Sequence, residues 1–175
     1  MAGKSVGSDT SSSDDPAASL AELRASRQTV QLATLDQLGT PHCGYAPFVF
    51  DGVSGDGAFV IFTSRLSLHT RDLLATPRAS VMLIADESES VEIFARTRAS
   101  YECRVEVIDQ NAPRYAELLD ALQARQGKMI GLLKTLPDFV LFRLVPERGQ
   151  FVMGFGKAYR LGGPALDRFE HATSA

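Results

Sequence analysis

Cysteine, histidine and long apolar runs are all scarce in this chain. It has two cysteines and three histidines in 175 residues, and the histidines are scattered, so no spacing matches a zinc site. Acidic residues (21) outnumber Lys and Arg (18), and the net charge is −3. This balance argues against a nucleic-acid-binding module, which normally shows a basic excess or stripe. No apolar run approaches the roughly 20 residues that span a bilayer, so no membrane association is expected.

Motifs for secretion and for nucleotide binding are also missing. The opening stretch, MAGKSVGSDTSSSDDPAAS, has no apolar core of the signal-peptide kind, and a cytoplasmic protein is therefore expected. In that compartment Cys43 and Cys103, each within a predicted strand, are expected to be buried free thiols. There is no P-loop and no Rossmann glycine triplet. GFGKAY has two glycines but follows a strand near the C-terminus.

Composition along the chain predicts one folded domain with two tails. Residues 1–19 are rich in Ser, Asp and Gly and predict a disordered N-terminal tail. The folded domain is expected over residues 20–160, with its first helix starting at Leu20, and residues 161–175 are expected to form a C-terminal tail. At 45 % hydrophobic and 22 % charged residues, the composition is that of an ordinary globular protein.

Hydrophobic periodicity predicts a mainly β fold with short helices. The predicted strands are TVQLATL, HCGYAPFVFD, AFVIFTS, RASVMLIAD (apolar enough for burial on both faces), TRASYECRVEVID and a closing hairpin, DFVLFRLVPERGQFVMGFG, that turns at PERGQ. Short helices are predicted over LAELRAS, LSLHTRDLLA, APRYAELLDALQARQG and KMIGLLKTLP. Six or seven mostly antiparallel strands favour a small barrel over a doubly wound sheet, which needs a regular alternation of strand and helix.

One segment, FTSRLSLHTRDLLATPRASVML, gathers hydrogen-bond donors where a strand gives way to a helix. The donors are the first free amides of the helix and the side chains of Thr63, Ser64, Arg65 and Ser67. Such a helix N-terminus accepts a phosphate or a carboxylate, and Arg65 and Arg71 can fork onto an oxyanion. For His69 two interpretations stay open: a histidine at the edge of the core held by one hydrogen bond, or a contact to a bound ligand.

Three further residues are weaker candidates. Arg98 lies on the polar face of the fifth predicted strand, and Lys157 sits beside a strand that should close onto the same barrel. Isolated basic residues of this kind are most often solvated. Asp138 opens a strand directly after Pro137, where an aspartate is commonly a simple turn or cap residue.

Four segments resemble a known family. They are LATLDQLGTPHCGYAPFVF, IFTSRLSLHTRDLLATPRASVMLI, IFARTRASYECRVEVI and LPDFVLFRLVPERGQFVMGFGKAY. Together they resemble the haem-utilisation proteins of the HutZ/HugZ type, within the FMN-binding split-barrel superfamily that also holds pyridoxamine 5′-phosphate oxidase. The resemblance runs from about residue 28 to 160. It implies an antiparallel split β-barrel of six or seven strands and a homodimer with ligand sites at the subunit interface.

The same resemblance implies a haem-binding protein that degrades haem oxidatively, with an electron donor that it does not identify. In this family a C-terminal histidine ligates the iron, and an aspartate at the position of Asp138 hydrogen-bonds that histidine from the partner subunit. His171 is the one histidine in this tail, although it lies closer to GFGKAY than the family ligand does. His69 and Arg98 match positions near the haem, so with Asp138 they form the implied catalytic set, and Lys157 is an implied cofactor contact.

Two alternatives remain from the sequence. The first is an FMN-dependent oxidoreductase in which residues 63–71 hold the phosphate. Flavin oxidases of this class usually carry a lysine in the helix where this chain has His69 and Arg71, and the strand HCGYAPFVF has no Lys or Arg. FMN binding in the oxidase manner is therefore not expected. The second alternative is a structural or storage barrel that has lost its ligand site.

Overall fold

The computed structural model describes residues 15–172, in which eight strands and four α-helices occur. The strands are β1 (Thr29–Leu35), β2 (Pro41–Phe50), β3 (Phe59–Ser64), β4 (Arg78–Ile84), β5 (Arg98–Ile108), β6 (Phe139–Gly154), β7 (Lys157–Gly162) and β8 (Arg168–His171). The helices are α1 (Pro16–Ser26), α2 (Leu68–Ala75), α3 (Pro113–Gln126) and α4 (Met129–Leu133), with short 3-10 turns η1 (Glu87–Glu89) and η2 (Ile93–Ala95). None of these described helices is both long and apolar enough to cross a membrane.

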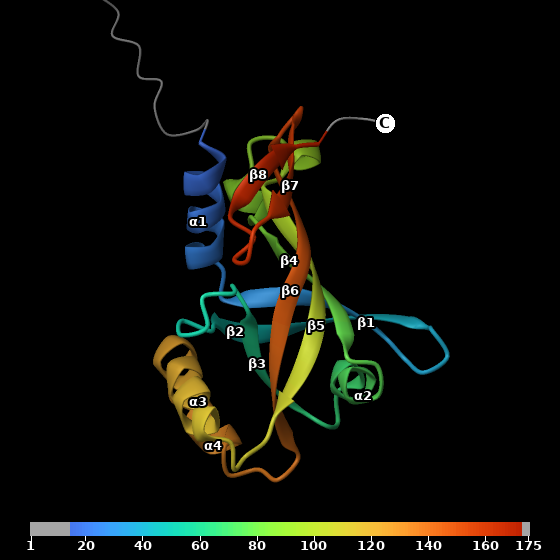
Figure 1. The fold of residues 1–175 in the computed structure, drawn as a ribbon, viewed down its shortest axis with the longest axis vertical. Coiled ribbons are helices and arrows are strands. Elements are labelled where there is room, and N and C mark those ends of the chain that lie inside the picture. The colour runs from blue at the N-terminus through green and yellow to red at the C-terminus, as the bar shows by residue number, and fades with distance from the viewer. Residues whose placement is uncertain (1–14, 173–175) are drawn as a thin grey trace, which may run out of the picture.

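The strands form one antiparallel sheet that closes on itself. Their order is β3-β2-β1-β4-β5-β6-β7-β8, and β3 also pairs with β6 (Figure 1). Strands β1 to β6 therefore make a closed barrel, and β7 and β8 extend the sheet beyond β6. This arrangement confirms the mainly β split barrel predicted from the sequence.

Alternating apolar residues fill the barrel. Every second residue of β1 is buried, and the same pattern runs through most of β5. The large side chains that are fully buried include Phe48, Phe59, Tyr101, Phe142 and Phe151. A second apolar cluster joins α3 and α4 to β3 and β6. The barrel and these two helices therefore fix the position of the β2–β3–β6 end of the molecule.

The predicted hairpin over residues 138–156 is one long strand instead. β6 runs unbroken from Phe139 to Gly154, and its pairing with β5 shifts register between Glu102 and Cys103. The shift leaves one extra residue at Glu147 opposite that step, as in a β-bulge. The PERGQ segment therefore bends the strand rather than reversing it, and the chain turns back only at Phe155 and Gly156.

Both predicted domain boundaries differ from the structure. Helix α1 starts at Pro16, before the predicted Leu20, because the Asp15 side chain caps it by accepting from the backbone N–H of Ala17 at 2.9 Å. At the other end, the segment predicted as a tail contains the last residues of β7 and all of β8, which pair through Tyr159 and His171. Residues 1–14 and 173–175 of the two predicted tails lie outside the described part.

Strand β4 is not buried on both faces as predicted. Its burial alternates, and Arg78 and Ser80 are exposed on the outer side. The buried residues of this strand, Ala79, Val81 and Leu83, all face the inside of the barrel. The prediction was wrong because an antiparallel barrel carries no helix layer over this strand, so only one face needs apolar residues.

A buried arginine ties the β2–β3 loop to β5 and β6. Nε of Arg143 donates to Asp51 Oδ2 at 2.7 Å, Nη1 donates to Glu106 Oε2 at 2.9 Å, and Nη2 pairs with Asp56. Arg114 of α3 donates to the second oxygen of Asp51 at 2.6 Å. Burial alone would raise the pKa of Asp51, but the hydrogen bonds, led by that from Arg143, hold it well below its usual range.

Asp51→Asn is expected to lower the free energy of unfolding by about 3–5 kcal/mol, because it leaves the buried Arg143 without its main counter-charge. In the native protein the contribution of Asp51 is fully present above the unfolded pKa of about 4 and is lost as the pH falls below it. Urea unfolding at pH 7 and pH 4 measures both effects. Asp120→Asn, which breaks the exposed pair with Lys134, is the control and should change little. Equal stability of Asp51→Asn and the native protein would contradict this assignment.

Candidate functional site

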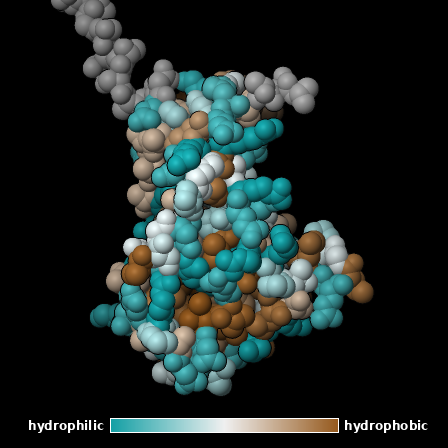
Figure 2. Space-filling model, in the orientation of Figure 1, coloured by the Kyte–Doolittle hydropathy of each residue, from teal (hydrophilic) through white to brown (hydrophobic). Residues whose placement is uncertain are grey.

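A cavity of about 600 Å³ lies between β2, the start of α2, and helices α3 and α4. Its apolar lining comes from Ala46, Pro47, Phe62, Leu68, Leu122, Ile130, Leu133 and Phe139, and its polar lining includes Cys43, Thr63, Ser64, Ser67 and His69. Hydrophobic surface is visible at the end of the molecule that carries α2, α3 and α4 (Figure 2). A largely apolar cavity of this size with a few polar groups is typical of a small-molecule site.

His69 lies in this cavity, pressed against the backbone of β2. A Cβ atom at Gly44 would come within 2.9 Å of His69 Nδ1, so the ring occupies the space that glycine leaves. The His69 Nε2 atom is buried and has no hydrogen-bond partner among residues 15–172. Burial lowers the pKa of His69, and the nearby charge of Asp72 only partly offsets that effect. Burial therefore favours the neutral imidazole, and its buried Nε2 atom is left without a partner among these residues.

The other predicted residues of segment 63–71 divide into two kinds. Thr63 is buried and its hydroxyl accepts a hydrogen bond from Thr70 at 2.8 Å, so it contributes to the cavity wall. Ser67 is the N-cap residue of α2, but its side chain makes no capping hydrogen bond. Arg65 and Arg71 are exposed, and neither forms an ion pair within the described residues. The predicted anion cradle stays a prediction: Ser64 and Ser67 line the cavity, whereas Arg65 and Arg71 do not.

Asp138 belongs to the same end of the barrel. Its carboxylate accepts a hydrogen bond from the Ser64 hydroxyl, and its carbonyl accepts from the backbone N–H of Arg65 at 2.8 Å. Ser64 and the next residue, Phe139, both line the cavity. Asp138 is half-buried and is tied to Ser64, a residue of the cavity lining, so both the turn role and the site role predicted for it fit its position.

Arg98, Lys157 and His171 lie at the opposite end of β6. Arg98 pairs with Val152 and Lys157 with Gly154, whereas Ser64 pairs with Phe139. With about 3.3 Å of rise per residue, the thirteen steps from Phe139 to Val152 separate the two groups by roughly 40 Å along the strand. Within one chain, the predicted site residues therefore form two groups that cannot touch the same ligand.

In the second group His171 is exposed, whereas Arg98 and Lys157 are half-buried. Nη1 of Arg98 donates to the carbonyl of Arg96 at 3.0 Å. His171 stands exposed on β8, with its ring 4.8 Å from that of Tyr159. Within residues 15–172 no group of three or more His, Cys, Asp or Glu side chains could hold a metal ion.

Sequence reasoning missed four residues around the cavity. Cys43 was expected to be buried but is an exposed free thiol that lines the cavity, because β2 projects past the barrel on that side. Cys103 is buried, as predicted. Gly44 was not singled out, although a glycine inside a strand often marks a close approach. His42 and Asp72 form a 2.8 Å pair beside the cavity. That pair depends on the docking of α2 against β2, which no local pattern encodes.

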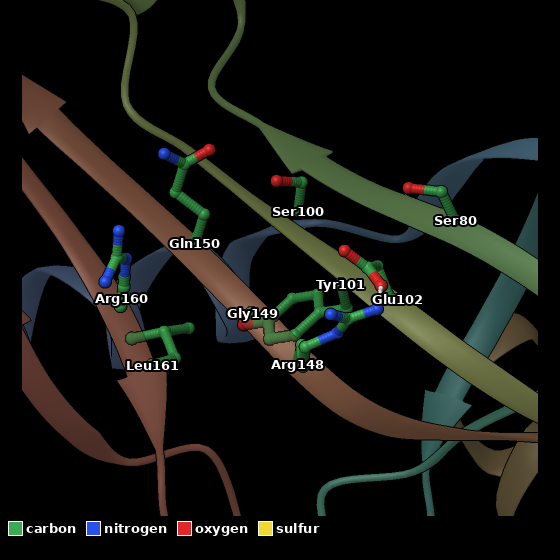
Figure 3. Close-up of a pocket in the computed structure, with 9 residues that line it drawn as sticks. All are labelled: Ser80, Ser100, Tyr101, Glu102, Arg148, Gly149, Gln150, Arg160 and Leu161. Atoms are coloured by element: carbon green, nitrogen blue, oxygen red, sulfur yellow. Dashed lines mark ion pairs between the residues drawn. The ribbon is translucent and has the colours of Figure 1, made fainter. Parts of the chain in front are cut away.

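A second depression, of about 390 Å³, lies on the outer face of β4 to β7 (Figure 3). Arg148 and Glu102 form an ion pair across β5 and β6, and Gln150 and Arg160 line the other part. None of the residues predicted from the sequence lines it. The cavity at His69 is therefore the better candidate site.

Gly44→Ala is expected to push the His69 ring out of its place, because the new methyl group would lie closer to Nδ1 than side chains normally approach. Once displaced towards water, His69 should recover a pKa near 6.5. A proton NMR titration of the imidazole measures this change. Gly52→Ala is the matched control, since a methyl group there meets nothing within 4 Å. An unchanged His69 titration in Gly44→Ala would contradict the close packing.

Comparison with known proteins agrees with this architecture. The family model of pyridoxamine 5′-phosphate oxidase matches residues 17–153. A Vibrio cholerae protein named heme oxygenase HutZ is 39 % identical over 150 residues, which cover 86 % of this chain and 83 % of that protein. The crystal structure of HutZ from Vibrio cholerae, described as a heme storage protein, matches with a TM-score of 0.71 and 34 % identity over 76 % of this chain and 92 % of that chain.

The crystal structure of Campylobacter jejuni ChuZ also matches, with a TM-score of 0.77 and 28 % identity. The match covers 87 % of this chain but only 60 % of that one. The barrel, the cavity beside α2 and the extent of the family match all point to one conclusion. The chain belongs to the pyridoxamine 5′-phosphate oxidase family and is of the HutZ type within it.

Proposed function

We propose that this protein binds haem in sites shared between two copies of the chain and that the dimer degrades haem oxidatively. The observation that carries the proposal is the division of the predicted site into two groups at opposite ends of β6. Neither group is sufficient alone. One offers an apolar cavity with His69 and Asp138, and the other offers basic side chains and His171.

A two-fold dimer would join these groups. In an isologous interface, residue i of one copy meets residue j of the other and the reverse contact also forms. If two barrels lie antiparallel, the cavity end of each meets the β7–β8 end of its partner, which gives two equivalent sites. The first group then supplies the cavity and the second closes it from the other subunit.

The residues at the two ends fit haem. The macrocycle is flat and apolar, as the cavity lining is, and its propionates are anionic. Arg98 and Lys157 are suited to the propionates, and His171 is the side chain in the second group able to ligate iron. His69 lines the cavity and would lie beside the bound ligand. Haem itself would supply the oxygen chemistry, whereas the chain binds and orients it.

Asp138 is suited to orienting His171 of the partner subunit. Its carboxylate is anchored by Ser64, and a carboxylate accepts hydrogen bonds at both of its oxygens. A hydrogen bond from the Nδ1–H of an imidazole would fix the tautomer that presents Nε2 to the metal and would strengthen it as a donor. In this arrangement Asp138 is a positioning residue.

Oxidative degradation also needs electrons from a partner outside the chain. The relative in Vibrio cholerae is named a heme oxygenase in one description and a heme storage protein in another. Both descriptions support haem as the ligand here. Turnover of bound haem with a chemical reductant and oxygen, followed as loss of the Soret band with release of iron, would support degradation rather than carriage.

An FMN-dependent oxidoreductase is the second candidate. Exposed Arg65 and Arg71 at the start of α2 are available to a phosphate, and this observation favours it together with the family membership. The absence of Lys and Arg from β2 counts against it. The absorption spectrum of the purified protein, followed by titration with FMN and with haemin, separates the two candidates.

Titration with haemin is expected to give a Soret band that His171→Ala shifts and weakens, because the iron loses its proximal ligand. Asp138→Asn should lower haem affinity by about 10–100-fold, because the carboxylate that would orient His171 of the partner subunit is lost. Glu170→Gln, next to His171 on β8 and likewise exposed, is the control and should bind as the native protein does. An identical spectrum and affinity in His171→Ala would show that another group ligates the iron.

Mixing the two defective variants tests the shared site directly. When Asp138→Ala and His171→Ala subunits are unfolded and refolded together, each heterodimer carries one doubly altered site and one native site. Random pairing then restores native binding to about a quarter of all sites. If both groups instead served a site within one chain, the mixture would bind no better than the separate variants.

A further inference from the structure

We infer that His42 and Asp72 form a clamp that sets the docking of α2 on β2 and thereby positions His69 in the cavity. Both are then positioning residues for the site proposed above. The functional consequence of the clamp rests on the proposed haem site, whereas the positioning can be tested without any ligand.

The clamp is built on a buried carboxylate. The Asp72 side chain is only 6 % exposed and lies on α2. Its Oδ2 accepts a hydrogen bond from the Thr34 hydroxyl of β1 at 2.7 Å and lies 2.8 Å from His42 Nδ1 of β2. One oxygen atom of the helix therefore contacts both strands of the β1–β2 hairpin.

The protonation states follow from these contacts. Burial would raise the pKa of Asp72, but the hydrogen bonds from Thr34 and His42 lower it below its usual value. An ionised carboxylate only accepts hydrogen bonds, so Nδ1 of His42 must carry a proton. The contact is then charge-assisted and directional, and it holds α2 at one distance from the strands.

Helix α2 meets β2 through two contacts, Asp72 with His42 and His69 with Gly44. Alternate residues of a strand face the same side, so His42 and Gly44 both face α2. Residues three apart lie on one face of a helix, so His69 and Asp72 both face β2. His42 holds Asp72 at 2.8 Å, while the His69 ring rests against Gly44. A shift or rotation of α2 would therefore break both contacts together.

This coupling explains how His69 stays buried without a partner for Nε2. An unpaired buried nitrogen costs free energy, and a free helix would turn to expose it to water. The buried hydrogen bond from Thr70 to Thr63 also resists that rotation, but it joins α2 to β3 and not to β2. The charge-assisted bond between His42 and Asp72 opposes the rotation at β2, so that the His69 ring keeps its place against Gly44.

His42→Leu and His42→Asn test the clamp. Leucine removes the donor, whereas the side-chain N–H of asparagine can lie near the position of Nδ1 and restore it. The His42 side chain is 27 % exposed, so both variants are milder than a change at Asp72. The ligand-free readout is the set of NOEs between the His69 ring and the Hα atoms of Gly44. They are expected in the native protein and His42→Asn, and lost in His42→Leu.

The functional readout is haemin affinity, which should fall about tenfold in His42→Leu and recover in His42→Asn. If His42→Leu keeps both the NOEs and the haemin affinity while its melting temperature falls, the pair is merely structural and the inference is wrong. If the NOEs vanish but affinity is unchanged, the clamp stands and the role of His69 at the haem site is wrong. Failure of the native protein to bind haemin overturns the proposed function and leaves the NOE test intact.

Discussion

Barrel closure through β6 is the constraint on which the rest of this structure depends. Its first residues pair with β3, most of its length pairs with β5, and its end pairs with β7. One strand of sixteen residues thus fixes both ends of the molecule. The bulge at Glu147 allows this length, because it bends the strand around the barrel without interrupting the pairing. The buried Arg143, near the middle of the same strand, fastens the β2–β3 loop to it.

The length of β6 also keeps the two groups of predicted site residues apart within one chain. Residues at its start share a cavity with α2, and residues at its end lie roughly 40 Å away, so a single copy presents two half-sites. In a two-fold dimer, the cavity end of each chain can meet the β7–β8 end of its partner, so the same separation allows two complete sites. The dimer proposed here therefore follows from where the residues lie as well as from the family resemblance.

The sequence predicted the barrel and most strand limits, because these depend on local periodicity and on turn and cap residues. It failed where tertiary pairing overrides a local signal. PERGQ has turn composition, yet pairing on both sides keeps it extended. Cys43 lies in a strand as predicted, but the strand projects from the barrel and the thiol is exposed. The pair of His42 and Asp72 joins residues 30 positions apart and has no sequence signature.

Carrying haem and degrading it need not require different sites. In the proposed dimer the chain would contribute the apolar cavity, the orientation of a ligating imidazole and a neutral His69 beside the ligand, and these would serve storage and catalysis alike. Storage and degradation would differ in whether electrons and oxygen reach the bound haem. A fold in this family therefore specifies the ligand more strongly than the reaction. On this view the clamp on α2 would affect haem binding in both roles through the position of His69, whereas access for an electron donor would decide between storage and degradation.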